Sequence, residues 1–200
     1  MAYKPFSQAC ENNKEPILQV IRQFFNTPAI VWEIGSGTGQ HACYFAGQLP
    51  HIVWQPTDRE ENIPGIRLWC DDACLDNLKP PLPLDITQAM WPCSRIDALF
   101  TANTLHIMSW HQVEVLFDRL AEKLNPGAII CIYGPFNYHG LYTSHSNASF
   151  DLWLKDRDAL SGIRDFEAVN ALASSKGIGL IDDVAMPANN RLLVMHKKDT

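Results

Sequence analysis

The feature that most constrains this fold is a glycine-rich turn between a short apolar run and an amphipathic segment. Residues 30–34 (IVWEI) are typical of a buried strand, and the turn that follows is Gly35-Ser36-Gly37-Thr38-Gly39-Gln40. After the turn, apolar residues recur at helical spacing, at Ala42, Phe45, Ala46 and Leu49. A strand, a glycine turn and a helix in this order predict the ligand-binding corner of an open α/β sheet.

Strands and helices are expected to alternate along the rest of the chain. We predict strands at 52–55, 82–86, 96–102, 128–133, 178–184 and 191–196, and helices at 13–25, 109–124, 148–156 and 166–175, whereas 59–81 is poorly patterned. In the helix at 148–156, Phe150, Trp153 and Leu154 are expected to face inward. Asn13 is the expected N-cap of the first helix, and Ser109 with Gln112 forms a capping box. The chain therefore predicts a doubly wound, Rossmann-like α/β fold. Its mostly parallel sheet would have about seven strands, helices on both faces and one antiparallel strand near the C-terminus.

Length and charge exclude several classes of protein. With 200 residues we expect a single domain over 1–200, whose N-terminal segment 1–28 covers the site. A net charge of −6 disfavours nucleic-acid binding, which needs a basic face. No apolar run is long enough for a signal peptide or a membrane span, so we expect a cytoplasmic protein with reduced cysteines. We expect no bound metal, and the oligomeric state stays open.

Three ligand classes use a turn of this kind, because glycines let a ligand approach the backbone and the helix N-terminus attracts anions. A P-loop is excluded, since no lysine follows the glycines. A dinucleotide fingerprint is weakened by Gln40 at its third glycine position. S-adenosylmethionine fits better because it carries a carboxylate and an ammonium but no phosphate. The alternative is a tight turn without a ligand.

Acidic residues follow three of the predicted strands and suit the parts of this cofactor. Glu33 would attract the ammonium, Asp58 would accept hydrogen bonds from both ribose hydroxyls, and Asp85 would accept one from the adenine amino group. Asp58 alone does not separate this cofactor from NAD, which also uses an acid about 20 residues beyond the turn. Asp58 and Asp85 are also residues that cap the segments after them.

Several segments together resemble class I S-adenosylmethionine-dependent methyltransferases and, more closely, a family related to methyltransferase-like protein 26. They are ENNKEPIL (11–18), VWEIGSGTGQHA (31–42), WQPTD (54–58), LPLDIT (82–87), ANTLHI (102–107), YGPF (133–136), SFDLWLKDRD (149–158), GIRD (162–165) and MPANNR (186–191). The resemblance implies a cofactor site lined by Glu33, Gly35, Ser36, Gly37, Gly39, Asp58, Arg59, Asp85 and Ile86, with Asn103 beside the methyl group. It implies a fold and a cofactor more firmly than a reaction.

Methyl transfer requires collinear positioning and, for a hydroxyl, a proton acceptor. His106 follows one predicted strand and Tyr133 is the last residue of another, and both are the catalytic candidates, although a packed histidine and a structural tyrosine are the alternatives. Residues that would contact a substrate are Asn13, Lys14, Phe136, His139 and Tyr142, together with Tyr3. Arg157, Asp158, Arg164 and Asp165 are expected to form an ion-pair network.

The sequence therefore favours methyl transfer from S-adenosylmethionine to a small molecule. A binding or scaffold protein without turnover and an NAD-dependent oxidoreductase are the alternatives.

Overall fold

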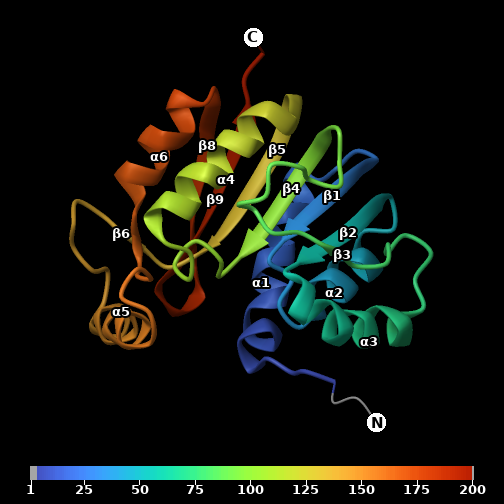
Figure 1. Ribbon diagram of the computed structural model, residues 1–200, viewed down its shortest axis with the longest axis horizontal. Helices are drawn as coiled ribbons and strands as arrows, with labels where there is room; N and C mark the ends of the chain where they lie inside the picture. The colour runs from blue at the N-terminus through green and yellow to red at the C-terminus, as the bar shows by residue number, and fades with distance from the viewer. Residues whose placement is uncertain (1–3, 200) are drawn as a thin grey trace. The chain divides into compact units, whose positions relative to one another are not determined.

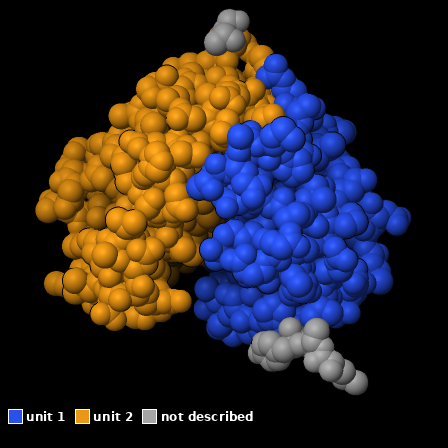
Figure 2. All heavy atoms as spheres, viewed as in Figure 1, with its two compact units in different colours: residues 1–101 blue, residues 102–200 orange. Residues whose placement is uncertain are grey.

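The computed structural model describes residues 4–199, and Tyr3 lies outside this range. The chain divides into two compact units, residues 1–101 and 102–200 (Figure 2). A seven-stranded sheet has the order β3-β2-β1-β4-β5-β9-β8. β1 is parallel to β2 and β4, β2 is parallel to β3, and β9 is antiparallel to both β5 and β8. The predicted doubly wound α/β fold with one antiparallel strand near the C-terminus is confirmed.

The first unit contains three α-helices and four strands (Figure 1). In chain order they are α1 (Gln8–Phe24), β1 (Ala29–Ile34), α2 (Gln40–Gln48), β2 (Ile52–Asp58), the short 3-10 helix η1 (Glu60–Asn62), α3 (Ile63–Ala73), β3 (Leu82–Pro83) and β4 (Ile96–Ala102). α2 packs against both α1 and α3. Because β1 and β2 run parallel, Glu33 and Asp58 approach the same edge of the sheet.

Three large aromatic side chains form the centre of this unit. The ring centroids of Phe45 and Trp54 are 5.3 Å apart, and those of Phe45 and Phe100 are 5.2 Å apart. None of the three is exposed to solvent. Burial of aromatic rings in tilted or edge contacts stabilises the unit and gives the residues at the strand ends a rigid support.

The second unit contains three α-helices and the remaining strands (Figure 1). They are α4 (Trp110–Lys123), β5 (Leu124–Gly134), β6 (Phe136–Asn137), α5 (His145–Arg157), β7 (Arg164–Asp165), α6 (Phe166–Ser175), β8 (Ile178–Met186), η2 (Pro187–Asn189) and β9 (Asn190–Lys197). Ser109 and Gln112 form the predicted capping box at the start of α4, and Asp165 caps α6. β6 and β7 pair in a small separate sheet that the sequence did not predict.

Four local predictions were wrong. The helix α1 starts at Gln8 with Ser7 as its N-cap, so Asn13 is not a cap but a buried helical residue. The poorly patterned stretch 59–81 contains α3, whose start carries Pro64. Trp153 was expected to face inward, but half of it is exposed. The strand predicted at 82–86 covers only Leu82–Pro83.

No helix within residues 4–199 is long and apolar enough to cross a membrane.

Candidate functional site

The glycine turn is held in a conformation that only glycine adopts without strain. Gly35, Gly37 and Gly39 have φ angles of 74°, 59° and 90°. At Gly39 a Cβ atom would lie 3.1 Å from Ile66 Cγ2 and 3.2 Å from its Cα, because α3 packs directly on the turn. At Gly37 a Cβ would meet no atom within 4 Å, and the residue is exposed. The turn is therefore closely packed at Gly39 and open to a ligand at Gly37.

Glu33 at the end of β1 is almost completely buried, with 1% of its surface exposed. Its Oε2 accepts hydrogen bonds from Ser36 Oγ (2.9 Å) and from Trp54 Nε1 (3.0 Å). Burial raises the pKa of the carboxyl to about 7, and the nearby charge of Asp58 acts in the same direction. Glu33 is thus a carboxylate whose ionised form would be favoured by a cationic ligand.

Asp58 at the end of β2 connects the strand to the glycine turn. Its Oδ2 accepts a hydrogen bond from the backbone N–H of Gly37 (2.7 Å). Its Oδ1 accepts from the N–H of Arg59 (2.7 Å) and from Asn62 Nδ2 (2.8 Å). The carboxylate therefore fixes the open part of the turn, and a ribose bound to it would have to share or replace these bonds.

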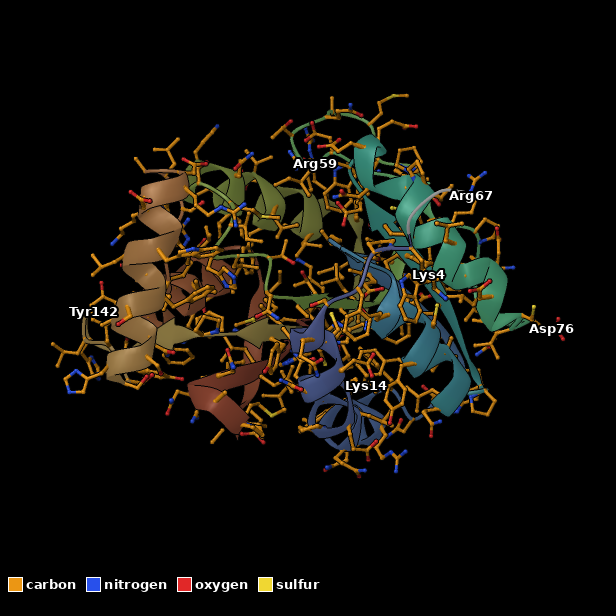
Figure 3. All side chains as sticks on the ribbon, turned by 90° about the horizontal axis from the view of Figure 1, so that it is seen from below. Lys4, Lys14, Arg59, Arg67, Asp76 and Tyr142 are labelled. Carbon is orange, nitrogen blue, oxygen red and sulfur yellow. The ribbon has the colours of Figure 1, made fainter. Side chains whose placement is uncertain are left out.

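The remaining predicted adenosine contacts lie near the end of β3. Asp85 Oδ1 accepts from Thr87 Oγ1 (2.7 Å) and from Thr87 N–H (2.9 Å), and these bonds lower the pKa of Asp85. Ile86 is buried. Arg59 projects from the end of β2 and forms an exposed ion pair with Glu61 at 3.1 Å (Figure 3).

Side-chain hydrogen bonds connect the first turns of α1 to the start of α2, a contact that the sequence did not predict. The Gln40 side chain accepts a hydrogen bond from Ser7 N–H (2.6 Å) and donates one to Glu11 Oε1 (2.6 Å). His41 Nε2 and Asn13 Oδ1 are 2.7 Å apart and both side chains are buried. In the sequence, Glu11, Asn13, Gln40 and His41 all lie in segments of the family resemblance, ENNKEPIL (11–18) and VWEIGSGTGQHA (31–42).

Lys14 lies on the same part of α1 (Figure 3). Its ammonium pairs with Glu11 and lies 4.9 Å from the centre of the Tyr44 ring. Asn13 and Lys14, which were expected to contact a substrate, therefore support contacts between α1 and α2 in this structure.

In the second unit, Asn103, His106 and Gly134 lie close together. Asn103 has a φ of 58°, in the left-handed region that asparagine adopts more readily than other non-glycine residues, and its N–H donates to Tyr133 O (2.8 Å). A Cβ atom built on Gly134 would lie 3.7 Å from His106 Nδ1 and 3.9 Å from Asn103 Oδ1. Because Gly134 has no side chain, two polar atoms face the space beside its backbone.

His106 is buried, with 5% of its surface exposed, and its ring packs edge-on against Phe150 at 5.3 Å. Within residues 4–199 no hydrogen bond reaches either ring nitrogen. Burial lowers the pKa of His106 to about 4, and the positive charge of Arg164 adds to the effect. The imidazole is therefore neutral at pH 7 and has a lone pair available. The neighbouring Tyr133 side chain is 3% exposed.

The other predicted substrate contacts are spread over the segment after β5. Phe136 is fully buried, and His139 is exposed and pairs with Glu167 at 3.2 Å. Tyr142 lies before α5 and its hydroxyl donates to Asp151 Oδ2 at 2.6 Å (Figure 3). The structure thus brings together Asn103 and His106, whereas Phe136, His139 and Tyr142 each have separate partners.

Comparison with known proteins assigns a family. A profile described as a protein of unknown function (DUF938) matches residues 4–197. The chain belongs to this family. Its description carries no reaction, so the DUF938 family gives the chain relatives but no function.

Solved structures of low sequence identity share the fold of this DUF938 protein. An O-methyltransferase family protein from Burkholderia thailandensis has a TM-score of 0.82 and 14% identity over 93% of this chain and 56% of its own. An O-methyltransferase family 2 protein from Planctomyces limnophilus, in complex with apigenin, has a TM-score of 0.82 and 15% identity over 94% and 58%. The S-adenosylmethionine-dependent methyltransferase SibL has a TM-score of 0.80 and 17% identity over 96% and 56%. The chain spans little more than half the length of these proteins.

Proposed function

We propose that the protein binds S-adenosylmethionine at the glycine turn and transfers its methyl group to a small molecule. The observation that carries the proposal is the open backbone at Gly37, whose N–H is bonded to Asp58 and whose neighbour Ser36 is bonded to Glu33. A pyrophosphate placed there would meet the charge of Asp58 and would oppose ionisation of Glu33, which disfavours a dinucleotide. A ligand with an ammonium group and no phosphate fits the same residues. When bound, this cofactor supplies an electrophilic methyl group on a sulfonium.

Each part of the cofactor would be bound by different residues of the chain. The start of α2 would attract the carboxylate of the cofactor, and Glu33 would hold its ammonium. Asp58 would accept from the ribose and Asp85 from the adenine. The similarity of the fold to proteins named S-adenosylmethionine-dependent methyltransferases, and the resemblance to the family of methyltransferase-like protein 26, support this assignment.

His106 is proposed as the proton acceptor and Asn103 as the residue that orients the acceptor group of the substrate. A neutral imidazole can accept a proton from an oxygen nucleophile as the methyl group arrives. A base with a pKa of about 4 is sufficient for this step, since an alkylated hydroxyl is strongly acidic. A hydroxyl-bearing acceptor is favoured because the structural relatives are named O-methyltransferases. Tyr133 is buried beside Asn103 and is proposed to support it rather than to react.

Two measurements test the proposal. Thermal unfolding with S-adenosylhomocysteine, S-adenosylmethionine, NADH and ATP in parallel should show stabilisation by the first two alone, about 2.7 kcal/mol at 100 times the dissociation constant. Transfer of an isotope-labelled methyl group to a library of small hydroxyl compounds should then be lost in His106→Asn. Stabilisation without transfer to any compound would favour a binding protein, and stabilisation by NADH alone would favour an oxidoreductase.

A further inference from the structure

The turn that carries His106 is held by another segment, residues 160–164, through its main-chain carbonyls. Arg164 Nε donates to Leu105 O (3.0 Å), and its Nη2 donates to Met108 O. Between these two carbonyls, Gly162 N–H donates to His106 O (2.9 Å) and Ser161 Oγ donates to Ile107 O (2.8 Å). Four consecutive carbonyl oxygens, 105–108, therefore each accept a hydrogen bond from residues 161–164.

The holding segment is itself fixed. Asp151 on α5 is buried, and its Oδ1 accepts from Ile163 N–H (2.7 Å). A Cβ atom on Gly162 would lie 3.0 Å from Asp151 Oδ1 and 3.1 Å from Lys155 Cε, so only glycine brings the segment this close to α5. The backbone of Arg164 also lies opposite that of Phe136 in the small parallel β6–β7 sheet. The segment is therefore a rigid support for the turn.

Arg164 does not act as the sequence suggested. An ion-pair network with Arg157, Asp158 and Asp165 was expected, but the Arg164 guanidinium is bonded to main-chain carbonyls, including Leu160 O at 3.0 Å. A planar guanidinium with several donors can reach two carbonyls of one turn at once, whereas a lysine ammonium cannot do so in the same geometry. Its positive charge also contributes to the lowered pKa of His106.

We propose that Arg164 is a positioning residue for His106, which sets the place of the imidazole by fixing the backbone on both sides of it. The inference rests on the proposed role of His106 as proton acceptor. It assigns a function to the GIRD segment, for which the fold alone requires no arginine. The guanidinium has two effects, one through its hydrogen bonds and one through its charge, and different substitutions separate them.

The experiment compares three variants by NMR, without any substrate. Arg164→Met removes both donors and charge, Arg164→Lys keeps the charge, and Arg157→Met is the matched control, since Arg157 on the same unit stacks over Trp153 at 4.6 Å. The readouts are the ring titration of His106, assigned with His106→Asn, and the hydrogen exchange of Gly162 N–H. In Arg164→Met we expect the His106 titration to move to higher pH and Gly162 exchange to accelerate at least tenfold.

The two other variants sharpen the result. Arg164→Lys should leave the His106 titration near that of the wild type while Gly162 exchange still accelerates, and Arg157→Met should change neither. A folded Arg164→Met protein with unchanged titration and exchange would overturn the proposal. If Arg164→Met does not fold, Arg164→Lys, which cannot bond to both carbonyls in the same geometry, must accelerate Gly162 exchange, and unchanged exchange there would overturn the proposal.

Failure of the proposed function is distinguishable from failure of this inference. Binding of S-adenosylhomocysteine should differ less than twofold between Arg164→Met and the wild type, because the contacts of Arg164 lie within residues 105–165. Absence of binding in every protein, including the wild type, would contradict the proposed function and leave the NMR result on Arg164 intact. Once an acceptor is known, Arg164→Lys should lower kcat with little change in KM.

Discussion

The two turns to which we assign proposed roles are held in opposite ways. In the first unit, the proposed ligand-binding groups themselves hold the turn: Asp58 bonds to the backbone of Gly37, and Glu33 bonds to Ser36. In the second unit, residues 161–164 hold the turn through its carbonyls, and the His106 ring makes no hydrogen bond within residues 4–199. Substitutions in the first turn should therefore change stability and binding together, whereas the His106 side chain should be removable at a small cost in stability.

The largest expected effect is the loss of stability in acid. His41 and His106 have pKa values lowered by burial from 6.5 to about 4. Between these values the unfolded chain binds protons that the folded chain does not. The stabilisation is therefore complete above about pH 6.5 and is lost as the pH falls toward 4, by as much as about 3 kcal/mol for each histidine. Urea unfolding at a series of pH values measures this slope.

Two variants test whether the buried histidines cause this dependence of stability on pH. His106→Asn should flatten the profile, and His111→Asn, at an exposed histidine of α4, should leave it unchanged. A profile equally steep in His106→Asn would show that this imidazole is not buried as described.

The second largest effect concerns the closely packed end of the first turn. Gly39→Ala combines a positive φ with a Cβ placed 3.1 Å from Ile66, and we expect a loss of about 2–4 kcal/mol. Gly127→Ala is the matched control, because Gly127 also has a positive φ (76°) but no neighbour within 4 Å, and it should cost about 1–2 kcal/mol. Equal losses in urea unfolding would mean that α3 does not pack on the turn.

Third, Glu33→Gln should stabilise the protein and weaken binding. The folded pKa of Glu33 is raised from 4.5 to about 7, so the ionised carboxylate is disfavoured in the fold and destabilises it as the pH rises through this range. An amide oxygen can still accept from Ser36 and Trp54, and we expect a gain of about 1–3 kcal/mol at pH 8. Affinity for S-adenosylhomocysteine should fall in the same variant. A variant that is less stable at pH 8 would contradict the comparison.

The smallest effect is the difference between the two buried histidines. His41 is bonded to Asn13 and stacked on Phe45 at 5.3 Å, so His41→Asn should cost about 2 kcal/mol. His106→Asn removes no hydrogen bond and should cost about 1 kcal/mol or less at pH 8. Equal losses of stability in the two variants would contradict the contrast between His41, which is held by a hydrogen bond, and His106, which is not.

The parts of the fold that the sequence predicts are those with local signals. The glycine turn and the Ser109 capping box each lie within a few residues, and both form as expected. The helix α3 was missed because its first turn contains Pro64-Gly65, a pair typical of a turn, and because only Ile63 and Ile66 of its residues are buried. Asn13 was predicted to be a helix cap, which is a local role typical of asparagine. Its actual partner, His41, lies 28 residues away, and no local pattern indicates that contact.

The candidate site follows the same rule. The glycines and the acids after the strands could be found from their order, since parallel strands end at one edge. The contacts of Gln40 with Ser7 and of Arg164 with Leu105 join residues 33 and 59 positions apart, and no local pattern contains them. The family segments include Gln40, Leu105 and Arg164 but not Ser7, and only the structure shows which segments meet within each unit.

The most direct test of the central claim is calorimetric titration of S-adenosylhomocysteine into the wild type, Asp58→Ala and Asp76→Ala. Asp76 is an exposed aspartate beyond α3 in the same unit and serves as the matched control (Figure 3). We expect binding to the wild type and to Asp76→Ala with equal affinity, and at least tenfold weaker binding to a folded Asp58→Ala protein. No binding to the wild type, or equal affinity in all three proteins, would contradict the claim that the glycine turn is the cofactor site.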